Sequence, residues 1–509
     1  MGATLTGTKA AQLKLIGKML AQTPSTHGVL TGKPGFRSDG FVLGQRMIGD
    51  GVKNYKWDAE PGPKAALGLS RGTLDGWKQN VAAPLVHSTY ASFGICFGLA
   101  ACLPSYIEIK RRHNPELPKL VSETASINYS GDSGSGKTSI GEAVAGLYGE
   151  PVLHDWDFSK PSFEESAAAR NNLVLVIDDT ETYLEESPSL KVQLRTVNEK
   201  IPAGRSKARS QVVAGQSYAN LTWCTFGMSS SPKSIGELAE EFKWKRTKGE
   251  LVRYIDISVP KPEEGGIFDE VPGPAHTHSV ASSKLVGKLK ANVASYYGTA
   301  MPAFITMLLQ EDMSAEVVKL TEKFVGKVHA KKGWDERLAR KFGIAYAAGK
   351  LAVKADILPW PEDWVFKAVV RCYRRALAGM AKHADVLNSK LHALKIASTD
   401  SAQFPAAKSG AKPIVCTSQT LGVSAIYKGQ PVIAVREEGL KVIAGSSAAA
   451  KELAKLLGTQ RILVGGQGHV RTTQLPVAIK VAGIKVLKPR FYVLDAVKLA
   501  AYGADSKAA

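Results

Sequence analysis

The sequence predicts an α/β protein with a parallel-sheet core, helical regions before and after that core, and a small basic domain at the C-terminus. Three observations carry this prediction: a glycine-rich motif at 131–138, an apolar run that ends in two acids at 171–179, and a helical pattern from about 280 to 395. A strand, a glycine loop and a helix, followed by a second buried strand, is the order that a doubly wound parallel sheet requires.

The charge balance of the chain favours a polyanionic partner. Its 509 residues include 66 Lys and Arg against 46 Asp and Glu, which gives a formal net charge of +20. Excess cations attract polyanions and make their binding salt-dependent, so nucleic acid is the expected partner. A merely basic, solvated surface is the alternative.

Cysteine usage and apolar patterning bear on location. The five cysteines are scattered and form no C-x-x-C pair, so we expect neither a disulfide framework nor a zinc site, and a cytoplasmic location. The most apolar stretch, 91–103, is too short to span a bilayer and predicts a buried helix. We therefore expect no membrane role.

Changes in composition divide the chain into five regions. A Pro- and Gly-rich loop at 260–266 closes the expected core, and the small, polar residues from 399 onward are typical of a linker. The expected regions are an N-terminal region with a helical segment at 1–115, the core at 116–262, a helical lid region at 263–398, a linker at 399–412 and a basic domain at 413–509.

Residues 131–138 fit the phosphate-loop pattern G-x-x-x-x-G-K-[ST]. Glycine lets backbone N–H groups approach the phosphates of ATP, Lys137 can reach the β- and γ-phosphates, and the Thr138 hydroxyl can bind Mg²⁺. A strand-like alternation at 125–130 precedes the motif, and apolar residues at helical spacing follow it. A glycine-rich surface loop is the alternative. The expected nucleotide-binding residues are Gly131, Asp132, Ser133, Gly134, Ser135, Gly136, Lys137, Thr138 and Ser139.

The five apolar residues at 173–177 end in Asp178 and Asp179. A continuous apolar run suits a central strand of a parallel sheet, whose carboxyl end lies beside the phosphate loop. There Asp178 can hold Mg²⁺ and Asp179 can polarise the attacking water, with Glu181 as a weaker candidate for the base. A strand followed by an acidic turn is the alternative.

A basic segment and a further strand follow. Arg205, Lys207 and Arg209 alternate with small residues, so in an extended hairpin they project on one side and suit contact with DNA phosphates. A solvated edge is the alternative. The strand expected before 231 ends in hydroxyls, of which Ser229 or Ser230 can sense the γ-phosphate and orient water.

Arg253 leads into a short strand at 254–257. In ring-shaped ATPases an arginine at this point reaches the nucleotide of the neighbouring subunit and stabilises transition-state charge. Arg246 competes for this role, and a structural ion pair is the alternative for either arginine.

These segments, in this order, resemble the helicase-like family of domains of unknown function found in primase–helicases of phages, plasmids and other mobile elements. The resemblance runs from about residue 35 to about 377. Among the segments that carry it are Gly40-Phe41-Val42-Leu43, Gly72-Thr73-Leu74-Asp75-Gly76-Trp77, Arg253-Tyr254-Ile255-Asp256-Ile257 and Arg340-Lys341-Phe342-Gly343-Ile344-Ala345.

The resemblance implies an AAA+-type ATPase, similar to superfamily-three and MCM-like helicases, that assembles as a ring, often a hexamer, around DNA. It implies ATP and Mg²⁺ as cofactors and a basic hairpin that engages DNA in the channel. Two positions depart from the family pattern: Asp179 stands where Glu is common, and serine stands at the sensor position where Thr or Asn is usual. No primase portion is evident, so a primase is expected only as a partner.

The C-terminal domain resembles a winged helix. An amphipathic helix is expected at 447–457 and strands at 462–464 and 490–494. A helix followed by a basic β-ribbon would place Arg471, Lys485, Lys488 and Arg490 near DNA. A small basic interaction domain is the alternative.

Together these features predict an ATP-dependent, ring-forming DNA helicase or translocase, acting on single-stranded or forked DNA in the replication of a mobile element or phage. Two alternatives remain open: an AAA+ loader or remodeller that acts on a protein–DNA complex without unwinding, and a DNA-binding regulator with a degenerate nucleotide site. The expected catalytic residues are Lys137, Asp178, Asp179, Ser229 and Arg253.

Overall fold

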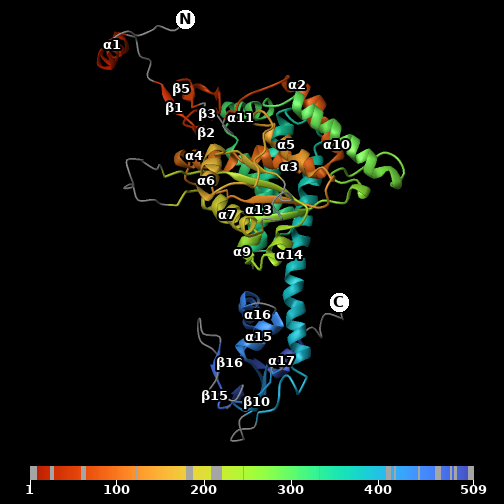
Figure 1. Ribbon diagram of the computed structural model, residues 1–509. Coiled ribbons are helices and arrows are strands. Elements are labelled where there is room, and N and C mark those ends of the chain that lie inside the picture. Colours follow the sequence, from red (N-terminus) through yellow and green to blue (C-terminus); the bar gives the residue numbers. More distant parts are fainter. Residues whose placement is uncertain are drawn as a thin grey trace. The chain divides into compact units, whose positions relative to one another are not determined.

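The chain forms two compact units in the computed structural model (Figure 1): Met1–Leu238 with Thr247–Ala376, and Ala239–Arg246 with Leu377–Ala509. Most of the three regions expected before the linker thus lies in the first unit, except 239–246 and 377–398, and the second boundary falls within helix α14 (Trp364–Ala397). The structure describes residues 8–22, 28–58, 65–120, 123–178, 187–207, 220–244, 246–331, 333–407, 414–417, 420–444, 447–464, 472–477, 479–481, 484–486 and 490–502.

A four-stranded parallel sheet carries the candidate site of the first unit. Its strands lie in the order β7 (Val174–Ile177), β8 (Phe226–Ser231), β6 (Ser126–Ser130) and β9 (Tyr254–Ser258). Every residue of β6, β7 and β8 is buried. Since the strands are parallel, their carboxyl ends lie at one edge of the sheet.

Among the described residues, five helices connect these strands along the chain, as the alternation of strand and helix predicts. The strand expected at 125–130 is confirmed as β6, and the helix expected after the glycine loop is confirmed, although it ends at Ala145. The helices are α5 (Lys137–Ala145), α6 (Lys160–Ala169), α7 (Ser187–Ala203), α8 (Ile235–Glu241) and α9 (Lys248–Leu251).

The buried helix expected at 91–103 is confirmed as α3 (Thr89–Ala100), in which all twelve residues are buried. Together with α4 (Leu103–His113) it is apolar and long enough to cross a membrane, but here α3 is enclosed by protein. A Cβ added at Gly94 would lie 2.6 Å from Cγ2 of Ile140 on α5, so the absence of a side chain lets the two helices approach closely. On its other side, Cys96 meets Gly349 of α13 (Trp334–Lys354).

Short strands precede α3. The segment Gly40–Leu43, which carries part of the resemblance, forms β3, the centre of an antiparallel sheet. This sheet is tied to the start of β7, because the N–H of Phe36 donates to Oδ1 of Asn172 at 3.1 Å. The elements are α1 (Lys9–Gln22), β1 (Val29–Thr31), β2 (Gly35–Arg37), β3 (Gly40–Leu43), β4 (Arg46–Ile48), β5 (Tyr55–Trp57), α2 (Leu74–Trp77) and the short turns η2 (Lys78–Ala82) and η3 (Ala83–His87).

The helical pattern expected from 280 to 395 is confirmed. Gly343 on α13 packs against α12, where an added Cβ would lie 2.9 Å from the carbonyl oxygen of Thr321. Phe324 of α12 then contacts the rings of Tyr346 and Tyr373 on the next two helices. The helices are α10 (His278–Ser295), α11 (Ala300–Gln310), α12 (Ser314–Lys327), α13 and α14.

The second unit is built on a four-stranded sheet with a different cover on each face. Ile433 and Leu494 belong to a core shared with helices, whereas Ala434 and Val493 belong to a core shared with Ile479 of a small three-stranded sheet. The large sheet has the order β11 (Gly422–Tyr427), β12 (Gln430–Val435), β16 (Arg490–Asp495), β13 (Thr473–Gln474). The small sheet contains β10 (Ile414–Cys416), β14 (Ile479–Val481) and β15 (Ile484–Val486), and the helices are α15 (Glu437–Ala444), α16 (Ser447–Thr459) and α17 (Ala496–Ala501).

This layering differs from the expected helix and basic ribbon on one surface. The helix at 447–457 and the strand at 490–494 are confirmed as α16 and β16. The β14–β15 hairpin, however, packs on the face opposite the helices, because Ile479 is buried in the other core. Arg490 donates to the hydroxyl and carbonyl of Thr472, so it braces β16, while Arg471 and Lys488 lie outside the described residues.

The linker expected at 399–412 also differs. Phe404 is buried in the helix-side core, and the N–H of Leu421 donates to the carbonyl of Gln403 at 2.9 Å. One aromatic side chain and a few backbone bonds therefore anchor a segment whose average composition is that of a linker. Residues 408–413 lie outside the described part of the chain.

We predict that Gly94→Ala destabilises the first unit by about 1–3 kcal/mol, because the added methyl group overpacks the contact with Ile140. Alanine otherwise stabilises a helix by about 0.5–1 kcal/mol relative to glycine. Gly287→Ala on α10 is the matched control, since nothing lies within 4 Å of its added Cβ. Urea unfolding should show opposite shifts for the two variants, and stabilisation by both would contradict the close α3–α5 packing.

Candidate nucleotide-binding site

The glycine motif connects β6 to α5 at the carboxyl edge of the sheet. The N–H of Gly131 donates to the carbonyl of Ser231 at 3.2 Å, which ties the start of the loop to the end of β8. The Lys137 ammonium donates to the carbonyls of Gly131 (2.7 Å) and Asp132 (2.8 Å) and to the Ser135 hydroxyl (3.3 Å). The amine is thus held inside the loop, where a phosphate would offer it a stronger, charged acceptor.

Gly136 is required at the turn into α5. Its φ is 92°, and an added Cβ would lie 2.9 Å from side-chain atoms of both Ile267 and Val286. Either constraint alone disfavours a larger residue. Of the other loop residues, Asp132, Ser133 and Gly134 are exposed, Thr138 is half-buried, and Ser135 and Ser139 are buried.

Asp178 follows β7 at the same edge of the sheet. Its carboxylate accepts a hydrogen bond from the Ser230 hydroxyl on β8 at 2.6 Å, and its N–H donates to the carbonyl of His154 at 2.8 Å. Ser231, the next residue of β8, binds Gly131. Two adjacent residues of β8 therefore link the loop to Asp178. Asp179 and Glu181 lie outside the described residues.

Ser229 points away from Asp178. Its hydroxyl donates to Oδ1 of Asn128 at 2.8 Å and lies 2.6 Å from the hydroxyl of Tyr254. Asn128 donates in turn to Oδ1 of Asp256 at 3.1 Å. Asp256 also accepts the N–H of Ile235, so this network joins three strands to the start of α8. Of the two serines considered for the sensor, Ser230 is the one beside the carboxylate.

The donor set fits Mg²⁺ that arrives with a nucleotide. Within the described ranges, no group of three or more His, Cys, Asp and Glu side chains could hold a metal ion. Mg²⁺ needs few protein ligands when phosphates are present, since it binds through one or two carboxylates, phosphate oxygens and retained waters. Asp178 and the hydroxyl of Thr138 match this requirement.

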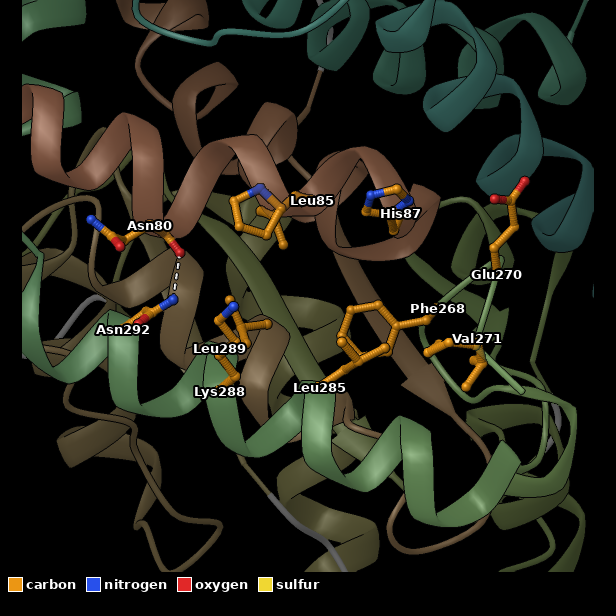
Figure 2. A pocket seen from close by; sticks show the side chains of 12 residues that line it. Asn80, Leu85, His87, Phe268, Glu270, Val271, Leu285, Lys288, Leu289 and Asn292 are labelled. Carbon is orange, nitrogen blue, oxygen red and sulfur yellow. Dashed lines mark hydrogen bonds between the residues drawn. The ribbon is translucent and has the colours of Figure 1, made fainter. Parts of the chain in front are cut away.

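A cavity of about 640 Å³ lies between η2–η3 and α10 (Figure 2). The ring of Phe268 and the side chains of Leu285 and Leu289 give it an apolar lining. Asn292 crosses to the other wall and donates to the carbonyl of Asn80 at 2.7 Å. The volume and the apolar lining with a few polar groups are typical of a small-molecule site.

This cavity adjoins the glycine loop. The N–H of Ile267 donates to the carbonyl of Ser135 at 3.0 Å, and Ile267 also touches Gly136. Phe268, the next residue, lines the cavity. One ligand with a planar apolar part and a phosphate part could therefore occupy the cavity and the loop together.

The described start of the basic segment pairs with the chain around Thr222. Arg205 pairs with Thr222 in an antiparallel bridge, and the N–H of Ser206 donates to the carbonyl of Leu221 at 2.9 Å. Arg205 and Lys207 are exposed on either side of the half-buried Ser206, as the alternation predicts. Arg209 lies outside the described residues.

Arg253 precedes β9, at the amino edge of the sheet, opposite the glycine loop. Its Nε donates to Glu123 at 2.8 Å, and Arg337 and Lys341 of α13 contact the same carboxylate. Burial raises the pKa of Glu123, but the three cations outweigh that effect and hold the pKa below its usual value. Burial lowers the pKa of Lys341 to about 8, against the opposing attraction of Glu123.

Several of these residues give no sequence signal. Glu123 is a single acid before a strand, and the cavity residues are spread from Asn80 to Asn292. The alternation at 126–130 is visible in the sequence, but it suggests that Asn128 faces solvent. In the structure Asn128 is buried, and its side chain is hydrogen-bonded inside the sheet. Arg246, considered beside Arg253, is 3% exposed and lies against the Trp244 ring.

The fold is that of a mixed α/β protein with a parallel sheet and many helices. It is similar to the solved structure titled "SCCmec type IV Cch - active helicase", with a TM-score of 0.61 and 13% identity, over 96% of this chain and 84% of that one. Residues 1–215 match the family described as "Domain of unknown function (DUF927)", a range that includes the glycine loop and Asp178.

Two further solved structures resemble the chain too weakly to indicate a shared fold. Two structures of the NrS-1 C-terminal region align over 72% of this chain, with 10% and 9% identity and TM-scores of 0.23 and 0.21. They cover 86% and 85% of those chains. No curated protein sequence matches the chain.

We predict that Ser229→Ala lowers the free energy of unfolding by about 1–3 kcal/mol, because it removes buried hydrogen bonds from the network around Asn128. Ser230→Ala is the matched control. It should cost less than about 1 kcal/mol, since water can replace its bond to the half-buried Asp178. Urea unfolding of both variants measures the difference, and equal losses would show that the two serines are equivalent.

Proposed function

We propose that the protein is an ATP-dependent DNA helicase or translocase that works as a ring in the replication of a mobile element or phage.

 The working form is proposed to be a homo-oligomeric ring, a hexamer. The observation that carries it is the shared sheet edge: β8 joins the glycine loop at Gly131 to the carboxylate of Asp178 through two adjacent residues.

Each residue at this edge has a proposed role. Lys137 neutralises the β- and γ-phosphates, and its present acceptors are carbonyls that a phosphate would outcompete. Thr138 and Asp178 hold Mg²⁺, which when bound neutralises charge on the phosphates. Asp179 positions the attacking water. The sensor role passes from Ser229 to Ser230, because Ser230 is the hydroxyl that contacts Asp178.

The cavity beside the loop is proposed to hold the nucleoside of ATP. Phe268 offers an aromatic surface for a base, and the chain runs directly from this residue to the Ile267–Ser135 contact at the loop. Phosphates and base would then be bound by neighbouring parts of the first unit.

Two further elements serve the ring. Arg253 is proposed to act on the nucleotide of the neighbouring subunit, and the hairpin with Arg205, Lys207 and Arg209 to grip single-stranded or forked DNA. The similar SCCmec structure is titled an active helicase, which supports the same activity here. A primase is the proposed replication partner, and the proposed location is the cytoplasm, away from membranes.

A strand-displacement assay separates this proposal from its rivals. Unwinding of forked DNA that requires ATP supports a helicase. ATP turnover without unwinding, on forks of either polarity, supports a loader or remodeller instead. ATP binding without turnover, with or without DNA, supports a regulator with a degenerate site.

We predict that Lys137→Ala lowers the kcat of ATP hydrolysis at least about 100-fold, because the phosphates lose a positioned cation. A coupled phosphate-release assay with and without DNA measures this loss. Lys160→Ala, an exposed lysine at the start of α6, is the matched control and should keep wild-type turnover. DNA-stimulated hydrolysis that survives in the Lys137 variant would refute the assignment of the loop.

A further inference from the structure

Arg253 is fixed at two points. Its Nε donates to Oε2 of Glu123 at 2.8 Å, which orients the side chain. The buried ammonium of Lys341 donates to the carbonyl of Val252 at 2.6 Å, which holds the backbone one residue earlier. Lys341 also lies 3.7 Å from Glu123, so the two anchors belong to one cluster.

The contact through Nε leaves the far end of Arg253 available. Its side chain is 42% exposed, and its two terminal nitrogens donate no hydrogen bond to any residue within the described ranges. Arg337, by contrast, donates a hydrogen bond to Glu123 from one of its terminal nitrogens. Of the two arginines in this cluster, Arg253 is the one whose two terminal nitrogens both lack a hydrogen-bond acceptor among the described residues.

The cluster has a surplus of positive charge. Arg253, Arg337 and Lys341 surround the single carboxylate of Glu123. A second anion would balance them, and a phosphate accepts paired hydrogen bonds from a guanidinium. The cluster therefore suits an incoming phosphate group.

The phosphate cannot come from the same subunit's loop. Arg253 immediately precedes β9, whose first residue pairs with Ser126 at the start of β6, and the loop begins after Ser130. Five strand residues span about 16 Å, which is more than an arginine side chain can cross. A nucleotide that meets Arg253 must be bound by another copy of the chain.

We propose that Glu123 and Lys341 are positioning residues that hold Arg253 ready for the phosphates of ATP bound in the neighbouring subunit. This inference rests on the proposed function, because it requires ATP hydrolysis at an interface between subunits. It adds which residues position Arg253 for that role.

Steady-state kinetics of Glu123→Gln test the positioning role. A misplacement of about 1 Å can cost about 100-fold in rate, so we expect kcat to fall about 10- to 100-fold while the KM for ATP changes less than about twofold. Lys341→Met should show the same split. Glu322→Gln is the matched control, since Glu322 pairs with Arg340 on the same helix α13 and should leave both constants unchanged.

Mixed rings separate a role in trans from a folding defect. Glu123→Gln subunits alone are expected to keep about 1–10% of the wild-type turnover. Lys137→Ala subunits alone are expected to keep about 1% or less. When they are mixed in equal amounts, about a quarter of the interfaces join an intact loop to an intact Arg253 cluster, so activity should return. Arg253→Ala mixed with Lys137→Ala should behave in the same way, and circular dichroism checks that each variant is folded.

The outcomes are distinct. A wild-type protein that hydrolyses no ATP refutes the proposed function and this inference with it. An active wild type with an unaffected Glu123→Gln variant refutes the inference alone, as does a mixture that regains no activity. A rise in KM without a fall in kcat also refutes it, because that would place Glu123 in nucleotide binding.

Discussion

The parallel register of β7, β8, β6 and β9 is the constraint on which the candidate site depends. Because the strands run in one direction, the glycine loop after β6 and Asp178 after β7 emerge at the same edge, with β8 between them. The same register puts Arg253, which precedes β9, at the opposite edge. One arrangement thus separates the groups proposed to bind a subunit's own nucleotide from the arginine proposed to act on a neighbour's.

Buried hydrogen bonds fix this register. Asn128 is paired with Ser229 on one side and Asp256 on the other, and its side chain bonds to both of those residues. A slip of one residue would turn these polar groups toward apolar neighbours and leave them unsatisfied. The polar residues inside the sheet therefore specify where its edge lies, and through that edge the position of Asp178 relative to the loop.

The sequence predicts the local parts of this site better than the distant ones. The glycine loop, β6, β7 and the buried α3 follow from spacing and apolar patterning within short windows. Glu123 and Lys341 are far apart in the chain, and their contact depends on how α13 packs, which no short window records. Residues 399–412 show a different error. Their small, polar composition predicts a linker, but the single ring of Phe404 is buried in the core of the second unit.

The excess positive charge of the chain is concentrated in its C-terminal region and not at the nucleotide site. Residues 377–509 contain 18 Lys and Arg against seven Asp and Glu, and 453–494 contain seven Lys and Arg and no acid. Cations concentrated in this way bind DNA phosphates without any turnover of ATP. Affinity for DNA alone therefore does not separate a helicase from a loader or a regulator. A change in ATP hydrolysis when DNA is added does separate them, because only hydrolysis reports on the sheet edge that carries Asp178.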